Sequence, residues 1–349
     1  MGALHVTLLI EDLGRLATAL PQDARLPALE RAWSRGTPRR LVAQTANHLR
    51  FALFGILPDG PLPVAALTHV GDRAARPDDD FYWLRVDPVT VWADMARVFM
   101  TRYGFADLDP YERNEIENCV RGILQEEGME LRGDHPERWC IPLGEPLRFG
   151  FTPLDKALGM DLADALPDHP EAAYWRRVFN EIQVALHHLP VNQRRRAAGK
   201  PEVNAVWFWG GGFIPEAAPH YGLDTVYSDH PVTRGLAIIN DCRLQRLDEC
   251  LNTDFGKDGQ AVLIDWTPGQ GDAETEAACV EWLARRLLRL AERGKLALTL
   301  YDGSGEGRSY GGMTRLRFWR RRVPLAQAMT QAMTQATTLP RASAGKAEA

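Results

Sequence analysis

Four short apolar segments, each followed at once by acidic residues or glycines, constrain the fold of this chain more than any other feature. They are VTLLI before Glu11, VWFW before Gly210, VLIDW around Asp265 and LALTLY before Asp302. Continuous apolar runs of this kind are typical of parallel strands that helices cover on both faces. Because ligands of open α/β sheets bind outside the carboxyl ends of the strands, we expect a site at these four ends. Each polar ending is also an ordinary turn signal.

Helix signals complete this pattern. Residues 274–293 carry apolar side chains at helical spacing, with Asp272 at the start. Since VLIDW precedes this helix and LALTLY follows it, the three elements predict a βαβ unit. A second helix is expected from Asp109, where Glu112 completes a capping box, and a third over residues 171–188.

Strand-like segments at residues 81–89 and 129–143 flank the helix that begins at Asp109 and predict a small α+β unit. The sequence therefore indicates an α/β protein with a mostly parallel sheet, helices on both of its faces and a small inserted α+β domain. The expected boundaries are residues 1–75 and 171–325 for the core, 76–170 for the inserted domain and 326–349 for a flexible tail.

The charge balance excludes some classes of partner. The chain has 41 Lys and Arg against 46 Asp and Glu, a net charge of −5, with 45% hydrophobic residues. This gives no electrostatic support for binding nucleic acid. No apolar run is long enough to span a membrane, the N-terminal MGALHVTLLI lacks the basic start of a signal peptide, and the five cysteines form no CxxC pair. We therefore expect a cytoplasmic protein with no nucleic-acid partner and no membrane partner.

The segment HHLPVNQRRRAAGKPEVNAVWFWGGG, residues 187–212, concentrates residue types that bind anions. Arginine can hold a phosphate or carboxylate through two parallel hydrogen bonds. Consecutive glycines after a strand let a ligand approach backbone N–H groups closely. A polar loop that ends in a Gly-rich turn is the alternative, and composition alone does not decide between the two.

This segment resembles the archaeal-type cofactor-independent phosphoglycerate mutases, which belong to the alkaline phosphatase superfamily. The positions that match the family pattern are Asn192, Arg195, Gly199, Asn204, Trp207, Trp209, Gly210 and Gly212. Over nearly its full length the chain also looks like the RpfE-type regulatory protein group. The resemblance implies an alkaline phosphatase-like sheet and a phosphoglycerate mutase-like protein.

The resemblance further implies a site for a small anionic metabolite, phosphorylated or carboxylated, in a regulatory role. In this interpretation Arg195 grips the anion, while Asn192 and Asn204 shape the loop. The predicted ligand-binding residues are His188, Asn192, Arg195, Asn204, Trp209, Gly211 and Gly212.

The chemistry of the family depends on groups that this sequence lacks. Its enzymes use a Ser nucleophile and two divalent metals held by Asp and His residues. Asp12 stands where the first metal-binding Asp is expected, but no Ser follows at a comparable place before residues 26–36, and no His occurs after His230. We therefore expect the two-metal centre to be lost, with no cofactor and no assignable catalytic residue. Whether the chain is an enzyme stays open at this point.

Two alternatives remain. In one, an active phosphate-ester mutase or hydrolase uses a reduced site in which Asp12, Asp265 and Asp302 converge on Mg²⁺ or Mn²⁺. In the other, the chain is a ligand-free scaffold that binds a protein partner through Trp83 and Trp92, although burial is the commoner fate of tryptophan.

Overall fold

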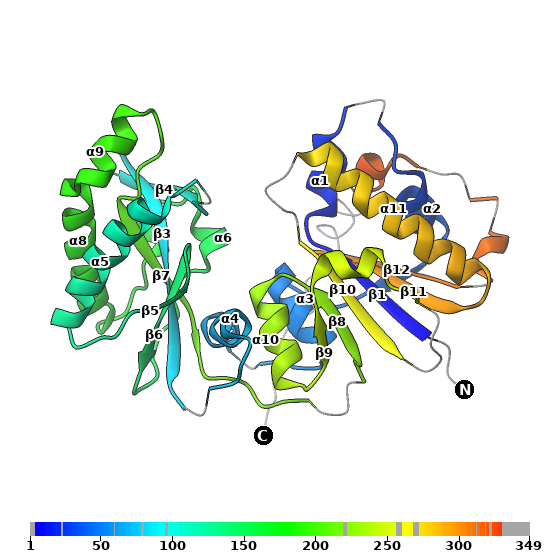
Figure 1. The fold of residues 1–349 in the computed structure, drawn as a ribbon, viewed down its shortest axis with the longest axis horizontal. Helices are drawn as coiled ribbons and strands as arrows, with labels where there is room; N and C mark the ends of the chain where they lie inside the picture. The colour runs from blue at the N-terminus through cyan, green and yellow to red at the C-terminus, as the bar shows by residue number, and fades with distance from the viewer. Residues whose placement is uncertain are drawn as a thin grey trace, which may run out of the picture. The chain divides into compact units, whose positions relative to one another are not determined.

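In a computed structural model the chain divides into two compact units, each built around its own β-sheet (Figure 1). Unit 1 comprises Met1–Ile56, Ala218–Thr233 and Asn240–Ala349, and unit 2 comprises Leu57–Ala217 and Arg234–Ile239. The structure describes residues 4–21, 24–58, 60–77, 80–94, 97–105, 107–218, 222–255, 260–267, 272–311, 313–317, 319–320 and 323–329.

Unit 1 contains a seven-stranded, mostly parallel sheet with the order β2-β12-β11-β1-β10-β8-β9. The strands are β1 (Leu4–Ile10), β2 (Thr37–Arg40), β8 (Thr225–Ser228), β9 (Arg243–Gln245), β10 (Ala261–Trp266), β11 (Leu296–Asp302) and β12 (Glu306–Tyr310). Strand β1 runs parallel to both β10 and β11, while β12 and β2 extend the sheet in antiparallel fashion. The predicted mostly parallel sheet is therefore confirmed.

Helix α11 (Ala273–Glu292) contacts both α1 (Leu13–Ala19) and α2 (Pro27–Arg35) in unit 1 (Figure 1). Val6 and Leu8 of β1, which point to one face of the strand, share a core cluster with Leu283 and Leu287 of α11. The predicted βαβ unit is present as β10, α11 and β11, and Asp272, expected at the start of this helix, caps α11. Unit 1 also contains α3 (Ala46–Leu53) and the 3₁₀ helices η1 (Leu247–Leu251) and η2 (Thr314–Leu316), and α10 (Pro231–Ile239) begins in it.

Unit 2 contains an antiparallel five-stranded sheet. Its strands are β3 (Tyr82–Asp94), β4 (Arg97–Tyr103), β5 (Arg132–His135), β6 (Arg138–Leu143) and β7 (Ala205–Gly212). The long strand β3 pairs with β4, β6 and β7. Strands β3, β4, β5 and β6 of this sheet lie within residues 76–170, where the sequence predicted a small α+β unit.

Helix α4 (Val64–Arg73) contacts β3 and β7, and α8 (Ala172–His188) contacts β7 and α5 (Pro110–Glu126) (Figure 1). Helix α5 begins with the predicted capping box, because Asp109 accepts from the backbone of Glu112 while the Glu112 carboxylate accepts from the backbone of Asp109. The remaining helices are α6 (Leu154–Ala157), α7 (Leu162–Ala165) and α9 (Pro190–Ala197).

One strand differs from the expectation. VWFW lies in β7, antiparallel to β3 in unit 2, and not in the parallel sheet. Both α4 and α8 cover β7, so its successive side chains are buried whatever the direction of the neighbouring strands. Unit 2 consequently reaches beyond the expected inserted domain of residues 76–170 and takes in α8, α9 and β7.

Most of the tail expected at residues 326–349 lies outside the described residues. In the part of the chain that the structure describes, no helix combines the length and apolar content needed to cross a membrane.

Candidate functional site

The carboxyl ends of three parallel strands in unit 1 bring acidic residues to one edge of the sheet. The register pairs Leu9 of β1 with Asp265 of β10, and Ile10 of β1 with Asp302 of β11. Glu11 follows β1 directly. This edge is where open α/β sheets bind their ligands, and three of the four predicted strand ends meet there.

Helix α3 places an arginine on this edge. The Thr45 hydroxyl caps α3 by accepting from the backbone N–H of His48, and the Arg50 side chain, 1% exposed, reaches the strand ends. Its Nε donates to Asp265 Oδ2 at 2.9 Å and its Nη2 to Glu11 Oε2 at 2.7 Å. Burial alone would lower the pKa of Arg50, but the two carboxylates raise it, so the guanidinium stays charged.

Asp265 has hydrogen-bond donors besides Arg50. Its Oδ2 accepts from the hydroxyl of Thr233 and, at 3.4 Å, from the hydroxyl of Ser228. The Asp265 side chain is fully buried, and a buried carboxylate needs such partners. Ser228 and Thr233, which donate these bonds, are themselves fully buried.

The three carboxylates of the Mg²⁺ or Mn²⁺ alternative do not form a shared ion site. Asp265 is engaged by Arg50, and Asp302 Oδ1 accepts from the backbone and hydroxyl of Ser304 within its own turn. The two aspartates also differ in exposure. Asp302 is buried, which raises its pKa, whereas the Asp12 residue is exposed to solvent. Within the described ranges, no group of three or more His, Cys, Asp or Glu side chains is placed to hold a metal ion. These residues therefore do not fit such an ion.

The loops at this edge nevertheless pack closely. Asp12 has a φ of 60°, in the left-handed region that non-glycine residues rarely adopt. A Cβ added at Gly303 would lie 3.5 Å from the Asp12 backbone nitrogen and 3.5 Å from Ala46 Cβ. Three segments therefore lie side by side at this edge: the end of β1, the turn after β11 and the start of α3. We take this part of the edge as the candidate site.

The predicted anion-binding arginine lies elsewhere, in the interior of unit 2. Arg195 is 0% exposed and donates to Glu112, Asp107 and the carbonyl oxygen of Pro201, each at 2.7 Å. A metabolite in solvent does not reach this guanidinium. The predicted grip of an anion by Arg195 therefore does not fit the geometry, because two carboxylates of the chain already neutralise it.

The two predicted asparagines join loops of unit 2. The Asn192 amide donates to the carbonyl oxygens of Leu186 and Val203 and accepts from the Val203 backbone. Asn204 bonds both the N–H and the carbonyl group of Val91. These contacts agree with the expectation that the amides shape the loop, while ligand binding by either side chain stays a prediction.

The predicted glycines of β7 are needed for close packing. A Cβ at Gly211 would come within 2.4 Å of the Tyr82 hydroxyl oxygen, and one at Gly212 within 2.5 Å of Pro63 Cβ. Because both positions lack a side chain, Tyr82 and Pro63 can pack closely against the backbone of β7 in unit 2. These contacts neither require nor test a ligand at the two backbone N–H groups.

The three tryptophans named as candidate site or surface residues differ in how deeply they are buried. Trp209 Nε1 donates to the buried Asp87 carboxylate at 3.0 Å. Trp83 is 0% exposed and stacks on His69 with ring centroids 3.8 Å apart, so its expected place on a partner-binding surface is wrong. Trp92 is 56% exposed, so its place on a partner-binding surface stays a prediction.

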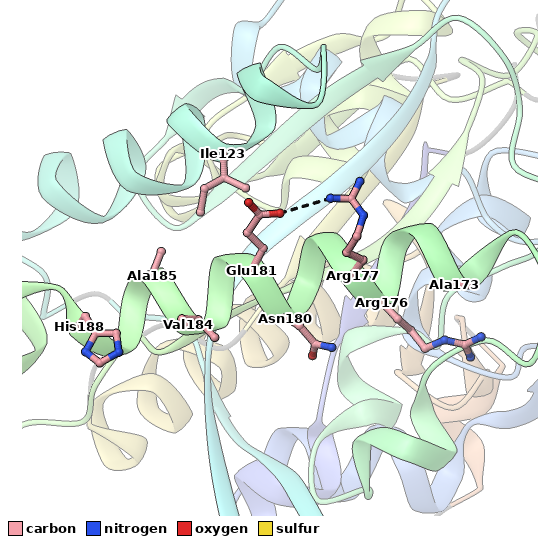
Figure 2. Close-up of a pocket in the computed structure, with 9 residues that line it drawn as sticks. All are labelled: Ile123, Ala173, Arg176, Arg177, Asn180, Glu181, Val184, Ala185 and His188. Carbon is pink, nitrogen blue, oxygen red and sulfur yellow. Dashed lines mark hydrogen bonds and ion pairs between the residues drawn. The ribbon is translucent and has the colours of Figure 1, made fainter.

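His188, the remaining predicted residue, lines an open groove of about 790 Å³ formed by α8 and Ile123 of α5 (Figure 2). Arg177 on the groove wall donates to Glu181 at 3.4 Å and to Glu127 at 2.7 Å. Asn192 and Arg195 are not part of its lining. His188 therefore lines a groove to which Asn192 and Arg195 do not contribute.

Arg50 was absent from the sequence-based candidates although a signal for it exists. It lies in the apolar segment LRFALF, where a charged side chain on a buried helix face requires carboxylate partners. Glu11 and Asp265, at predicted strand ends, are those partners.

This chain has relatives among known proteins. No protein-family profile matches it. A 2,3-bisphosphoglycerate-independent phosphoglycerate mutase of Pyrobaculum neutrophilum is 37% identical over 157 residues, which cover 41% of this chain and 37% of that protein. A protein of the same name from Methanosarcina barkeri is 31% identical over 68 residues, or 20% of this chain and 17% of its own length. The matched regions thus span well under half of these relatives.

Among solved structures, the PH0037 protein from Pyrococcus horikoshii superposes with a TM-score of 0.53 and 13% sequence identity, covering 94% of this chain and 93% of its own. A cofactor-independent phosphoglycerate mutase from Thermoplasma acidophilum gives a TM-score of 0.46 at 14% identity, too low to indicate a shared fold by itself. The sequence matches confirm the resemblance to cofactor-independent phosphoglycerate mutases. The likeness to the RpfE-type group stays a prediction.

Proposed function

We propose that this phosphoglycerate mutase-like chain binds a small phosphorylated or carboxylated metabolite in a regulatory role, without a two-metal catalytic centre. One observation carries the proposal: the buried guanidinium of Arg50 joins Glu11 and Asp265 at the strand ends of unit 1. The edge that serves for ligands in sheets of this kind is therefore kept, while the chain itself offsets one of its two carboxylate charges.

Electrostatics explains why this neutralisation suits an anionic metabolite. Two unpaired carboxylates at the strand ends would repel a phosphate or carboxylate group, and the repulsion is strong where water is excluded. Arg50 offsets one of these charges. The start of α3, which carries the partial positive charge of a helix N-terminus, lies beside Gly303 at the same edge. The partly buried imidazole of His48 follows on that first turn.

The hydroxyl groups at this edge favour binding over group transfer. A serine or threonine nucleophile needs an activating base and access to its substrate. Ser228 and Thr233 are fully buried and donate to Asp265, and the Ser304 hydroxyl donates to Asp302 at 2.7 Å within a tight turn. None of these three hydroxyls is oriented as a free nucleophile.

Calorimetric titration of the full chain with 3-phosphoglycerate tests the proposal, once with EDTA present and once with Mn²⁺. We expect saturable binding of the same affinity in both buffers, weakened in His48→Ala and unchanged in a control variant at the exposed Trp92 of unit 2, Trp92→Ala. A coupled assay for interconversion of 3- and 2-phosphoglycerate should show no turnover. Mn²⁺-dependent turnover, or no binding in either buffer, would contradict the proposal.

A further inference from the structure

Oxygen atoms of four residues surround the guanidinium of Arg50. Nε lies 2.9 Å from Asp265 Oδ2. Nη2 lies 2.7 Å from Glu11 Oε2, 3.3 Å from Asp265 Oδ1 and 3.2 Å from Thr267 Oγ1. Nη1 lies 3.4 Å from Glu11 Oε1 and 3.3 Å from Asn47 Oδ1. Every partner is a carboxylate, amide or hydroxyl oxygen, the donor types that hard divalent cations bind.

The parts of this cage come from separate elements of unit 1. Glu11 follows β1, Asp265 and Thr267 come from the end of β10, and Asn47 lies in the first turn of α3. Asp265 is 0% exposed at its side chain and Glu11 is 28% exposed. The fold therefore fixes the oxygens independently of the arginine side chain that they contact.

Loss of the arginine from such a cage would leave a buried carboxylate without its main counter-charge. That state is strongly unfavourable, and it is relieved by a proton or by another cation. Two carboxylates with an amide and a hydroxyl oxygen can contribute four protein ligands to one ion, and water reaching Glu11 can supply more.

We propose that Arg50 is the built-in cation of this oxygen-lined site: its guanidinium excludes divalent cations from the wild-type chain, and its truncation opens a site for Mn²⁺ or Mg²⁺. A side-chain cation cannot dissociate, so one carboxylate charge at the strand ends stays offset whatever the supply of metal. The inference goes beyond the proposed function, because it concerns the cation and holds whether or not a metabolite binds.

The test compares wild-type chain with Arg50→Ala by titration with Mn²⁺, followed by electron paramagnetic resonance of the free ion and by thermal unfolding. Wild type should neither bind Mn²⁺ at this edge nor gain thermal stability from it. Arg50→Ala should bind the ion at least about tenfold tighter than any weak binding that wild type shows elsewhere, because its carboxylates lack their counter-charge. Guanidinium at low, non-denaturing concentration should compete with Mn²⁺ for the variant.

Two controls connect the ion to this cage. Arg50→Ala combined with Asp265→Asn should lose the Mn²⁺ binding that the single variant gains. Arg195→Ala removes another buried arginine with two carboxylate partners, but Asp107 there is 37% exposed and is hydrated once released. That variant should gain no Mn²⁺ site.

Each outcome decides the matter. A folded Arg50→Ala chain that binds no Mn²⁺, or a wild-type chain that binds it at a site lost in Asp265→Asn, overturns the proposal. Should Arg50→Ala fold only in the presence of Mn²⁺ or guanidinium, the proposal is supported; failure to fold with either overturns it. Arg50→Lys keeps a cation and should exclude Mn²⁺. The proposed function is tested by phosphoglycerate binding in EDTA, where no Mn²⁺ takes part. A negative Mn²⁺ result therefore overturns the cation proposal without overturning the proposed function.

Discussion

Each unit contains a fully buried arginine between two carboxylates, yet the two arginines serve different parts of the fold. Arg50 joins Glu11 and Asp265, which stand at the ends of neighbouring parallel strands in unit 1. Arg195 joins Glu112, a member of the α5 capping box, to Asp107 in unit 2. The comparison shows that the elements supplying the carboxylates, and not the arginine's local sequence, decide whether a buried cation belongs to a candidate site.

The largest expected effects separate the two arginines directly. Arg50→Ala and Arg195→Ala should each lower the free energy of unfolding by about 3–5 kcal/mol, because each removes the counter-charge of a buried carboxylate. Urea unfolding in metal-free buffer measures both losses. Added Mn²⁺ should restore stability to the Arg50 variant alone. Equal restoration in both variants would remove the distinction between the two sites.

A glycine pair tests whether the β7 glycines serve packing. Gly212→Ala should destabilise the chain by about 1–3 kcal/mol, since its Cβ would lie 2.5 Å from Pro63 Cβ. Gly122 of α5 has no atom within 4 Å of an added Cβ. Gly122→Ala should therefore stabilise by about 0.5–1 kcal/mol, through helix propensity. Thermal unfolding of both variants gives the comparison, and a neutral Gly212→Ala would argue against the packing role.

The helix caps of the two units give a smaller effect. Asp109→Ala and Asp272→Ala should each cost about 1 kcal/mol by loss of a side-chain cap. Asp109 belongs to a reciprocal box with Glu112, whereas Asp272 accepts from the backbone N–H of Thr275, which has no carboxylate to return the bond. We therefore expect the larger loss at Asp109, with faster amide exchange confined to the first turn of α5. The opposite ranking would show that the capping box adds nothing there.

The smallest effect is a pH dependence that unit 2 contributes. Burial, together with the nearby Arg138 guanidinium, lowers the pKa of His135 to about 4 from an ordinary 6.5. The unfolded chain therefore binds a proton that the folded chain does not, and stability present above pH 6.5 is lost as the pH falls toward 4. In His135→Gln the melting temperature should fall less steeply over this window. Solvent screening at this partly buried residue keeps the change modest.

Local signals in the sequence were sufficient for much of the fold. Asp109 and Asp272 predict the starts of α5 and α11 correctly, because a cap depends on residues three or four positions away. The strands around Asp265 and Asp302 are also in the predicted parallel sheet. Strand β7 was placed in the wrong sheet, because burial by α4 and α8 produces the same apolar run as a parallel neighbour would.

The candidate site was harder to predict because its decisive contact joins residues far apart in sequence. Glu11 and Asp265 were recognisable as strand ends, but nothing local indicates that Arg50 lies between them. Arg195, by contrast, stands in a segment rich in polar residues and glycines, and its partners Glu112 and Asp107 are also distant in sequence. Residue type marked Arg195 as able to bind an anion, whereas only the tertiary structure shows that both arginines already have their counter-charges.

The central position of β1 has a consequence for how the chain acquires its structure during synthesis. β1 leaves the ribosome early, whereas β10 and β11, its neighbours on either side, are made after all of unit 2. Unit 2 can therefore complete most of its contacts while β1 still lacks both partners. Such distant pairings are slow to form, and an unpaired apolar strand is prone to aggregate. The segment LHVTLLI therefore stays without its two neighbouring strands until β10 and β11 have been made.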